Sequence, residues 1–244
     1  MIFKFDYIIE PQAVDTTLTA RIATIETMLL NSAGKAADRL HIGVEDLLKD
    51  NYAWVLARIA WEMDYRPKLG TTITVETWID HVEHSFSFRN FRVTQEGRQI
   101  GLGKSIWTVL DLTTRRPVNL LTEERFVKLN TNIDNGMTVP QKVRAAASDN
   151  AYHYKTVYSD IDFNGHCNSV QYLQWMLNAL PAEQAAQIQS ERIDMNYLHE
   201  IMPEEQISVV YEQTDNQLIF EVRNAEGKPA ARASINIPVQ NDRQ

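Results

Sequence analysis

The chain has 244 residues, of which 44% are hydrophobic and 23% charged, as expected for a globular protein with one large or two small domains. Its net charge of −8 argues against nonspecific nucleic-acid binding, which depends on Lys and Arg. No apolar run is long enough for a membrane span, and charged residues interrupt the first dozen positions where a signal peptide would be apolar. A single cysteine fits a reducing compartment. From these features together, we expect a cytoplasmic protein with no nucleic-acid or membrane partner.

The first half of the sequence predicts one long helix followed by strands. Apolar residues share one helical face over residues 25–40, namely Ile25, Met28, Leu29, Ala33, Ala36, Ala37 and Leu40. Residues 58–79 and 87–112 are rich in β-branched residues and alternate in polarity, which favours strands. Glu96 and Gly97 predict a turn within the second of these stretches.

The middle of the chain has the composition of a linker. Asn135, Gly136 and Pro140 interrupt regular structure, and the alanine run 145–147 favours a short helix. We therefore expect an N-terminal domain over residues 1–130, a linker over 131–149 and a C-terminal domain over 150–244.

The second half carries the most informative motif, between Tyr158 and Trp175. Asp162, Asn164 and His166 occupy every second position, so in an extended segment their side chains project from one face. Asn168 follows as a helix cap, before apolar residues at helical spacing: Val170, Leu173, Leu177 and Leu180. Polar groups beside a helix N-terminus suit attack on an acyl carbonyl, although Asp, Asn and Gly are also ordinary loop residues.

The two halves of the chain share one pattern. Tyr65 is matched by Tyr197, residues 73–75 by 207–209, the turn at 96–97 by 226–227, and residues 105–106 by 234–235. A tandem duplication is the simplest interpretation. A helix wrapped by an antiparallel sheet, present twice, predicts an α+β fold of the tandem double hot-dog type, in which each sheet wraps a long helix.

These residues resemble the acyl-acyl carrier protein thioesterases of plant plastids and bacteria over nearly the whole chain. The first half carries WVLARIAWEMDYRPKLGTTITVETWI from Trp54 and SIWTVLDLTTRRPVNL from Ser105. In the second half, the motif residues from Asp162 to Asn168 match the family's Asp-x-Asn-x-His-x-Asn pattern. The segment from Tyr197 aligns with the family's glutamate-bearing segment and places that glutamate at Glu200.

The resemblance implies hydrolysis of fatty acyl thioesters to free fatty acid and carrier protein. It implies a catalytic set of Asp162, Asn164, His166 and Glu200, and a partner, acyl carrier protein bearing an acyl-phosphopantetheine. No cofactor is implied, and no HExxH or paired-cysteine pattern predicts a metal site. The oligomeric state stays open between a self-sufficient chain and a homodimer.

Two carboxylates compete for the main chemical role. We expect Asp162 to activate water or attack the carbonyl, with Glu200 orienting the water or holding His166, although these roles can be exchanged. Asn164 suits positioning of water or the thioester, and backbone amides near residues 165–167 suit an oxyanion. Plant members commonly have a cysteine after the glutamate, where Ile201 stands here. We expect Cys167 to pack as a small hydrophobe and not to act as a nucleophile.

Other functions remain as alternatives at this stage. They are an acyl-coenzyme A thioesterase, a hot-dog dehydratase or hydratase, and a noncatalytic acyl-binding protein. The remaining histidines have no obvious partner in the sequence: His41, His81, His84 and His153. His199 adjoins Glu200. The basic pairs Arg115 with Arg116 and Lys142 with Arg144 are the candidates for docking an acidic protein. The acyl chain length is beyond what the sequence specifies.

Overall fold

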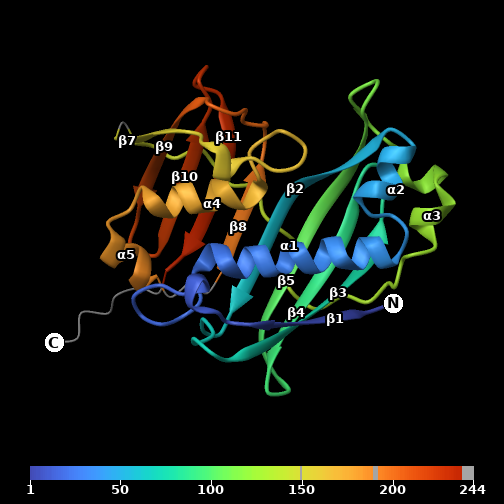
Figure 1. Cartoon of the computed structure of the whole chain (residues 1–244), viewed down its shortest axis with the longest axis horizontal. Helices are drawn as coiled ribbons and strands as arrows, with labels where there is room; N and C mark the ends of the chain where they lie inside the picture. The colour runs from blue at the N-terminus through green and yellow to red at the C-terminus, as the bar shows by residue number, and fades with distance from the viewer. Residues whose placement is uncertain (149, 189–191, 238–244) are drawn as a thin grey trace. The chain divides into compact units, whose positions relative to one another are not determined.

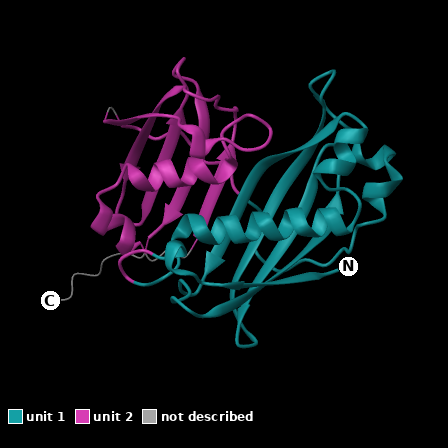
Figure 2. Cartoon of the chain, viewed as in Figure 1, with its two compact units in different colours: residues 1–14, 18–140 teal, residues 15–17, 141–244 magenta. Residues whose placement is uncertain are grey.

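A computed structural model describes residues 1–148, 150–188 and 192–237 of the chain (Figure 1). It divides into two compact units (Figure 2). Unit 1 comprises residues 1–14 and 18–140, and unit 2 comprises residues 15–17 and 141–244. Residue 149 of the expected linker and residues 238–244 of the expected C-terminal domain lie outside the described residues.

Unit 1 is an antiparallel sheet that carries one long helix on one face. Its sheet has the order β1-β3-β4-β5-β2, and a short strand, β6, pairs with β5. The strands are β1 (Phe3–Ile8), β2 (Tyr52–Met63), β3 (Thr72–Val82), β4 (Ser87–Gln95), β5 (Arg98–Asp111) and β6 (Arg116–Pro117). The helices are α1 (Ile22–Arg39), α2 (Val44–Lys49) and α3 (Glu124–Val127), with 3-10 turns η1 (Pro11–Ala13) and η2 (Leu120–Thr122). Figure 1 shows α1 lying across the sheet.

Unit 2 has the same plan with shorter elements. Its sheet has the order β8-β11-β10-β9-β7 and is also antiparallel. The strands are β7 (Ala151–Lys155), β8 (Arg192–Tyr197), β9 (Gln206–Gln213), β10 (Gln217–Arg223) and β11 (Pro229–Asn236). The helices are α4 (Ser169–Asn178) and α5 (Ala182–Gln187), preceded by the 3-10 turn η3 (Tyr158–Asp160). The helix α4 packs against β9 and β10.

The two sheets match strand for strand, which confirms the predicted tandem hot-dog fold. In both, the strand before the helix pairs with the second strand after the helix, and the first strand after the helix lies beside the last long strand. The sequence echoes fall on equivalent elements: the turn at Glu96 and Gly97 joins β4 to β5, and Gly227 lies in the turn between β10 and β11. Both glycines have positive φ, 78° and 77°, which other residues adopt at a cost.

The predicted helices are present and are defined by their apolar faces. In α1 the buried apolar residues recur every three or four positions: Ile22, Ile25, Met28, Leu29, Ala33, Ala36 and Ala37. Leu40 lies one residue past its end. In α4 the buried residues include Leu173 and Leu177, whereas Leu180 follows the helix. Each helix therefore turns its apolar stripe toward its own sheet.

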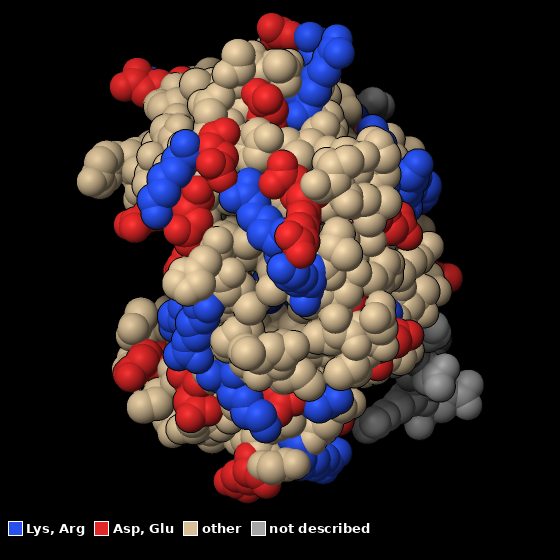
Figure 3. All heavy atoms as spheres, turned by 90° about the vertical axis from the view of Figure 1, so that its right-hand side faces the viewer, with Lys and Arg blue, Asp and Glu red and all other residues tan. Residues whose placement is uncertain are grey.

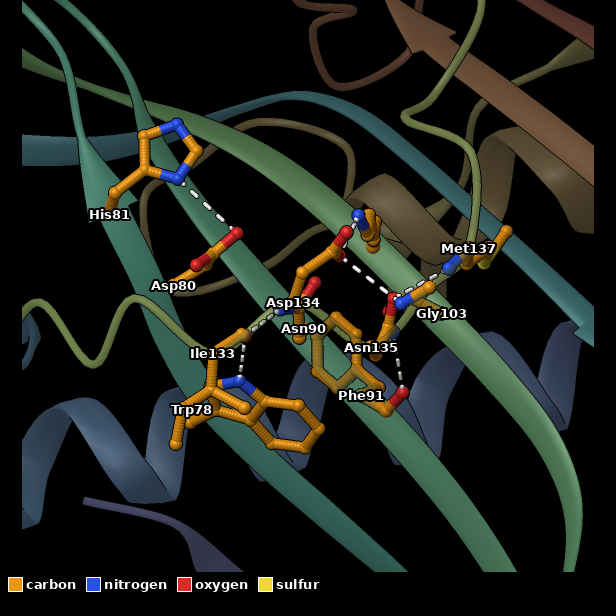
Figure 4. A network of polar contacts seen from close by, with 12 residues as sticks. Trp78, Asp80, His81, Asn90, Phe91, Gly103, Ile133, Asp134, Asn135 and Met137 are labelled. Carbon is orange, nitrogen blue, oxygen red and sulfur yellow. Dashed lines mark hydrogen bonds and ion pairs between the residues drawn. The ribbon is translucent and has the colours of Figure 1, made fainter.

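The expected linker is divided between the two units after Pro140. Residues 131–140 belong to unit 1, and the residues from Gln141 onward belong to unit 2. On the unit 1 side, the carbonyl of Ile133 accepts from Trp78 Nε1 at 2.7 Å and from Asn90 Nδ2 at 2.8 Å (Figure 4). On the unit 2 side, the Gln141 amide donates to Asp194 Oδ1 at 2.7 Å. Over residues 131–148 no helix forms, so the short helix expected there is wrong. These bonds tie the backbone at Ile133 and Gln141 to strand residues, without a helix.

Candidate functional site

The segment that carries Asp162, Asn164 and His166 is a hairpin loop, so the expected extended conformation is wrong. Ile161 and Cys167 form an antiparallel bridge. The Asn168 amide donates to the Asp160 carbonyl at 2.7 Å, and the Asp162 amide donates to the His166 carbonyl at 2.9 Å. Residues 162 and 166 are therefore directly opposite each other, which is the arrangement that brings side chains together on one face.

The tip of this loop is shaped by Asp162 and Gly165. The Gly165 amide donates to the Asp162 carbonyl at 3.0 Å, and the Asn164 amide donates to Asp162 Oδ1 at 2.8 Å. Gly165 has a φ of 79°, a left-handed conformation that favours glycine. One oxygen of the Asp162 carboxylate is thus engaged in holding the turn, in the manner of an Asx turn.

Asn164 occupies the exposed tip of the loop. Its backbone amide is bound to Asp162, and its side chain makes no hydrogen bond to any of the residues that the structure describes. The loop therefore presents this carboxamide outward, away from contact with His166 and Glu200.

His166 and Glu200 form the contact that joins two separate segments of the site. His166 Nε2 lies 3.6 Å from Glu200 Oε2, and the two side chains are 30% and 45% exposed. The segments are tied together beside this pair, because the Cys167 amide donates to the Ile201 carbonyl at 2.9 Å. The structure thus places His166 of the motif in direct contact with Glu200, and both side chains are accessible to solvent.

The helix that follows the loop begins as expected. Asn168 Oδ1 accepts from the Val170 amide at 3.2 Å and caps α4. The expected oxyanion amides are mostly occupied, because Gly165 donates to Asp162 and Cys167 donates to Ile201. Of the amides at 165–167, that of His166 alone has no acceptor within the described part of the chain.

Cys167 packs as a small hydrophobe, as expected. It is 6% exposed, and its sulfur lies 3.9 Å from the Met202 carbonyl. Burial, with a contribution from the Asp160 carboxylate, raises the pKa of the Cys167 thiol to about 12. Because the thiolate is the reactive form, this thiol is held in its unreactive state at neutral pH.

Sequence reasoning missed the buried polar side chains that pack beside the loop. Asp160 is 4% exposed, and its Oδ2 accepts from Tyr154 Oη at 3.0 Å and from the Val157 amide at 2.8 Å. Thr156 Oγ1 donates to the Met202 carbonyl at 2.9 Å. Ordinary polar residues near a turn gave no signal that they would be buried, because burial depends on the sheet that covers them.

Three histidines outside the loop have partners that the sequence did not indicate. His81 Nδ1 lies 3.2 Å from Asp80 Oδ2 (Figure 4). The His81 ring stacks on Phe88 with centroids 4.5 Å apart. His84 Nδ1 lies 2.9 Å from Ser85 Oγ. His199, next to Glu200, has its Nδ1 2.8 Å from the Pro229 carbonyl. This contact holds the His199 ring against the backbone at Pro229.

The basic candidates for docking differ in their surroundings. Arg144 forms a bidentate pair with Glu212, with Nη1 to Oε2 at 2.8 Å and Nη2 to Oε1 at 2.6 Å. The hydrogen bonds from Arg144 hold the pKa of Glu212 down at about 2. Arg115 and Arg116 are exposed. On the face drawn in Figure 3, basic and acidic side chains are interspersed, so charge alone does not single out a docking surface there.

The described ranges contain neither a metal-binding cluster nor a membrane-spanning helix. No group of three or more His, Cys, Asp or Glu residues among them has the geometry to hold a metal ion. No helix in those ranges has both the length and the apolar character needed to cross a bilayer.

Comparison with protein families gives two matches in chain order. The description "Acyl-ACP thioesterase N-terminal domain" matches residues 1–127, and "Acyl-ACP thioesterase C-terminal domain" matches residues 143–237. The first match covers unit 1 up to α3, and the second covers β7 to β11 with the loop and Glu200.

Individual relatives agree with these matches. The chain is 24% identical to the chloroplastic palmitoyl-acyl carrier protein thioesterase of Arabidopsis thaliana over 74% of its length, covering 48% of that protein. It is 22% identical to oleoyl-acyl carrier protein thioesterase 2 of the same plant over 92% of its length, covering 67% of the relative. The chain thus spans about half the length of the first relative. The crystal structure of an acyl-ACP thioesterase from Bacteroides thetaiotaomicron is 28% identical, with a TM-score of 0.90 and coverage of 97% of this chain and 98% of that one.

Proposed function

Because this chain belongs to the acyl-ACP thioesterase family, we propose that it hydrolyses fatty acyl thioesters of acyl carrier protein, releasing free fatty acid. The contact that supports this is the one between His166 and Glu200, 3.6 Å apart and open to solvent. It lies in the part of the chain that matches the family's C-terminal domain. A carboxylate beside an imidazole is a common arrangement for activating water.

Hydrolysis at this pair requires activation of water and stabilisation of an oxyanion. We assign the base role to Glu200: it takes a proton from water, the oxygen adds to the carbonyl carbon, and the carbon–sulfur bond then breaks. The departing thiolate needs little acid help, because thiols have a pKa of about 8.5, and it recovers the proton from Glu200. His166 holds Glu200, and its amide is available to the developing negative charge.

This assignment exchanges the roles that the sequence favoured for the two acids. Asp162 Oδ1 already accepts from the Asn164 amide, so this carboxylate is engaged in maintaining the turn. Glu200 is the carboxylate in direct contact with His166. All four residues stay in the proposed site, with Asp162 shaping the loop that presents Asn164 and His166.

The substrate class follows from the family, whereas its chain length does not. The two Arabidopsis thaliana relatives carry the names palmitoyl and oleoyl, and their identities to this chain are 24% and 22%. These similar values give no preference for either acyl group. One methylene in an apolar site is worth only about 1 to 3 kcal/mol, so small differences in lining residues suffice to change the preference.

The test is thiol release from a series of saturated acyl carrier proteins of different chain length, with free fatty acid measured in parallel. We expect both products in equal amounts, faster than from the matching coenzyme A esters, and both reduced in Glu200→Gln. Faster turnover of the coenzyme A esters would redirect the proposal to that substrate. Binding without thiol release would indicate an acyl-binding protein, and a change in the acyl chain without thiol release would indicate a dehydratase or hydratase.

Two further aspects are proposed from composition. A cytoplasmic location is supported by the single cysteine in 244 residues, and cell fractionation tests it. A docked acyl carrier protein is the expected partner, while pairing of two chains is tested by the mass of the purified protein in solution.

A further inference from the structure

The hydroxyl of Tyr172 contacts the main chain on both sides of Glu200. Tyr172 lies in α4 and is 4% exposed. Its Oη accepts from the Ile201 amide at 3.0 Å and is 3.3 Å from the His199 carbonyl, to which it donates. Glu200 is the residue between these two groups. It lies in an irregular segment between β8 and β9, where no ladder of strand hydrogen bonds fixes the backbone.

The equivalent position in unit 1 has neither the side-chain hydroxyl nor the backbone N–H of this contact. The Ala20 amide donates to the Pro67 carbonyl at 2.7 Å, as the Cys167 amide does to Ile201, so Pro67 corresponds to Ile201. Proline has no N–H to donate. Five residues after Ala20 in α1 stands Ile25, which has no hydroxyl, whereas five residues after Cys167 in α4 stands Tyr172. The hydroxyl therefore occurs in the unit that carries Glu200.

We propose that Tyr172 is a positioning residue that holds the backbone around Glu200 so that its carboxylate meets His166. This inference rests on the proposed function, in which Glu200 activates water. Ile201 is fully buried, and its amide requires an acceptor wherever Glu200 is placed. The hydroxyl supplies that acceptor and also binds the carbonyl before Glu200, which restrains the peptide units on both sides of it.

Burial keeps this hydroxyl in the form that the contact needs. Burial raises the pKa of the Tyr172 phenol well above its usual range, so the group stays protonated and can donate and accept together. The ring is fixed by Tyr197 and Trp175, whose centroids lie 5.8 Å and 5.2 Å from it. Removing the hydroxyl alone leaves these ring contacts in place.

The first experiment compares Tyr172→Phe with Tyr7→Phe. Tyr7 Oη lies 2.9 Å from Ser32 Oγ and joins β1 to α1 within unit 1, whereas every residue of the proposed site belongs to unit 2. Both variants lose one hydroxyl and are expected to unfold at a lower temperature. Tyr172→Phe alone should lower kcat, by about tenfold, with KM nearly unchanged, because small displacements of a reacting group are costly. Unchanged kcat in Tyr172→Phe would overturn the proposal.

The second experiment places Tyr172→Phe in a Glu200→Gln background. A residue that acts through Glu200 should lower kcat little further once that carboxylate is absent, whereas an independent structural effect multiplies with it. A full tenfold loss in both backgrounds would overturn the positioning role. If Glu200→Gln alone kept wild-type kcat, Glu200 would not be the base, and the proposed function would fail. If Glu200→Gln lowered kcat but Tyr172→Phe did not, only the positioning role of Tyr172 would fail.

Discussion

The loop from Val14 to Ala20 and the loop from Ile161 to Cys167 have one backbone plan and different chemistry. Each is closed by an antiparallel bridge between its end residues. Each follows a 3-10 turn, η1 or η3, and precedes the long helix of its repeat. In each, the second residue is an aspartate whose Oδ1 accepts from the amide two positions later at 2.8 Å: Asp15 from Thr17, and Asp162 from Asn164.

The side chains proposed for chemistry are absent from the first loop. Thr17 stands where Asn164 does, and Thr19 where His166 does. Arg66 precedes Pro67 and so takes the place of Glu200; it is 8% exposed, and its Nη1 lies 3.4 Å from the Ala20 carbonyl. A guanidinium offers hydrogen-bond donors and no acceptor, so it cannot activate water as a base.

The comparison separates what folds the loop from what performs the reaction. The aspartate is present in both copies with the same hydrogen bond, so its role in the turn does not depend on catalysis. Asn164, His166 and Glu200 occur in the second copy alone. This division supports a role in shape for Asp162 and the proposed chemistry for His166 and Glu200.

The largest effects are expected from removing groups that the first loop lacks. Glu200→Gln and His166→Ala should each lower kcat by about 10²-fold or more, because general acid–base groups contribute on that scale. Steady-state thiol release from an acyl carrier protein substrate measures this. Thr19→Ala is the matched change in the first loop, and its kcat should stay within about twofold of wild type, as for a neutral substitution.

Two variants of Asp162 test whether this residue acts as the base or maintains the turn. Asp162→Asn keeps an oxygen that can accept from the Asn164 amide, so it should retain far more activity than Glu200→Gln. Asp162→Ala removes the acceptor and should lose more, at least about tenfold, by loosening the loop. Equal losses in Asp162→Asn and Glu200→Gln would return the base role to Asp162. Asp15→Asn is the control for the turn itself.

The sequence predicted the repeated fold because its determinants are local. Helical spacing defined α1 and α4, a turn pair defined the end of β4, and Asn168 capped α4. It also predicted that Glu200 meets the motif, through the family pattern. It did not predict the hairpin around Asp162, because polar residues at every second position occur both in an extended strand and in a hairpin loop. The contact between Tyr172 and Ile201 joins residues 29 positions apart, and local pattern carries no information on such pairs.

A smaller effect is expected from exchanging the residue types at the left-handed position of each loop. Gly165 has a φ of 79°, and Leu18, its counterpart, has a φ of 60°. A Cβ on Gly165 would meet no atom within 4 Å, so Gly165→Ala tests backbone strain without a clash and should cost about 1 kcal/mol in the free energy of unfolding. Leu18→Gly should change that free energy in the opposite direction or little, because relief of strain is offset by chain entropy of about 0.5 to 1 kcal/mol.

Denaturant unfolding of both variants measures these changes in free energy. The kcat of each variant then shows whether the loop that was changed takes part in turnover. Gly165→Ala should also reduce turnover severalfold, because His166 lies next to it, whereas Leu18→Gly should leave turnover unchanged. A stabilised Gly165→Ala, or equal losses of turnover in both variants, would contradict the parallel between the two loops.

The smallest effect is expected at the end residues of the bridges, where Cys167 corresponds to Ala20. Cys167→Ser should leave kcat nearly unchanged, because burial raises the pKa of the thiol to about 12 and keeps it protonated. Above that pKa the thiolate would appear, so any activity that depended on it would rise steeply with pH through the alkaline range. A pH profile of kcat without such a rise, identical in wild type and Cys167→Ser, is therefore expected. Cys167→Ala matches the first loop and controls for burying a hydroxyl, which itself costs about 1 to 3 kcal/mol of stability when unpaired. Loss of activity in both variants with the fold intact would make the thiol a participant.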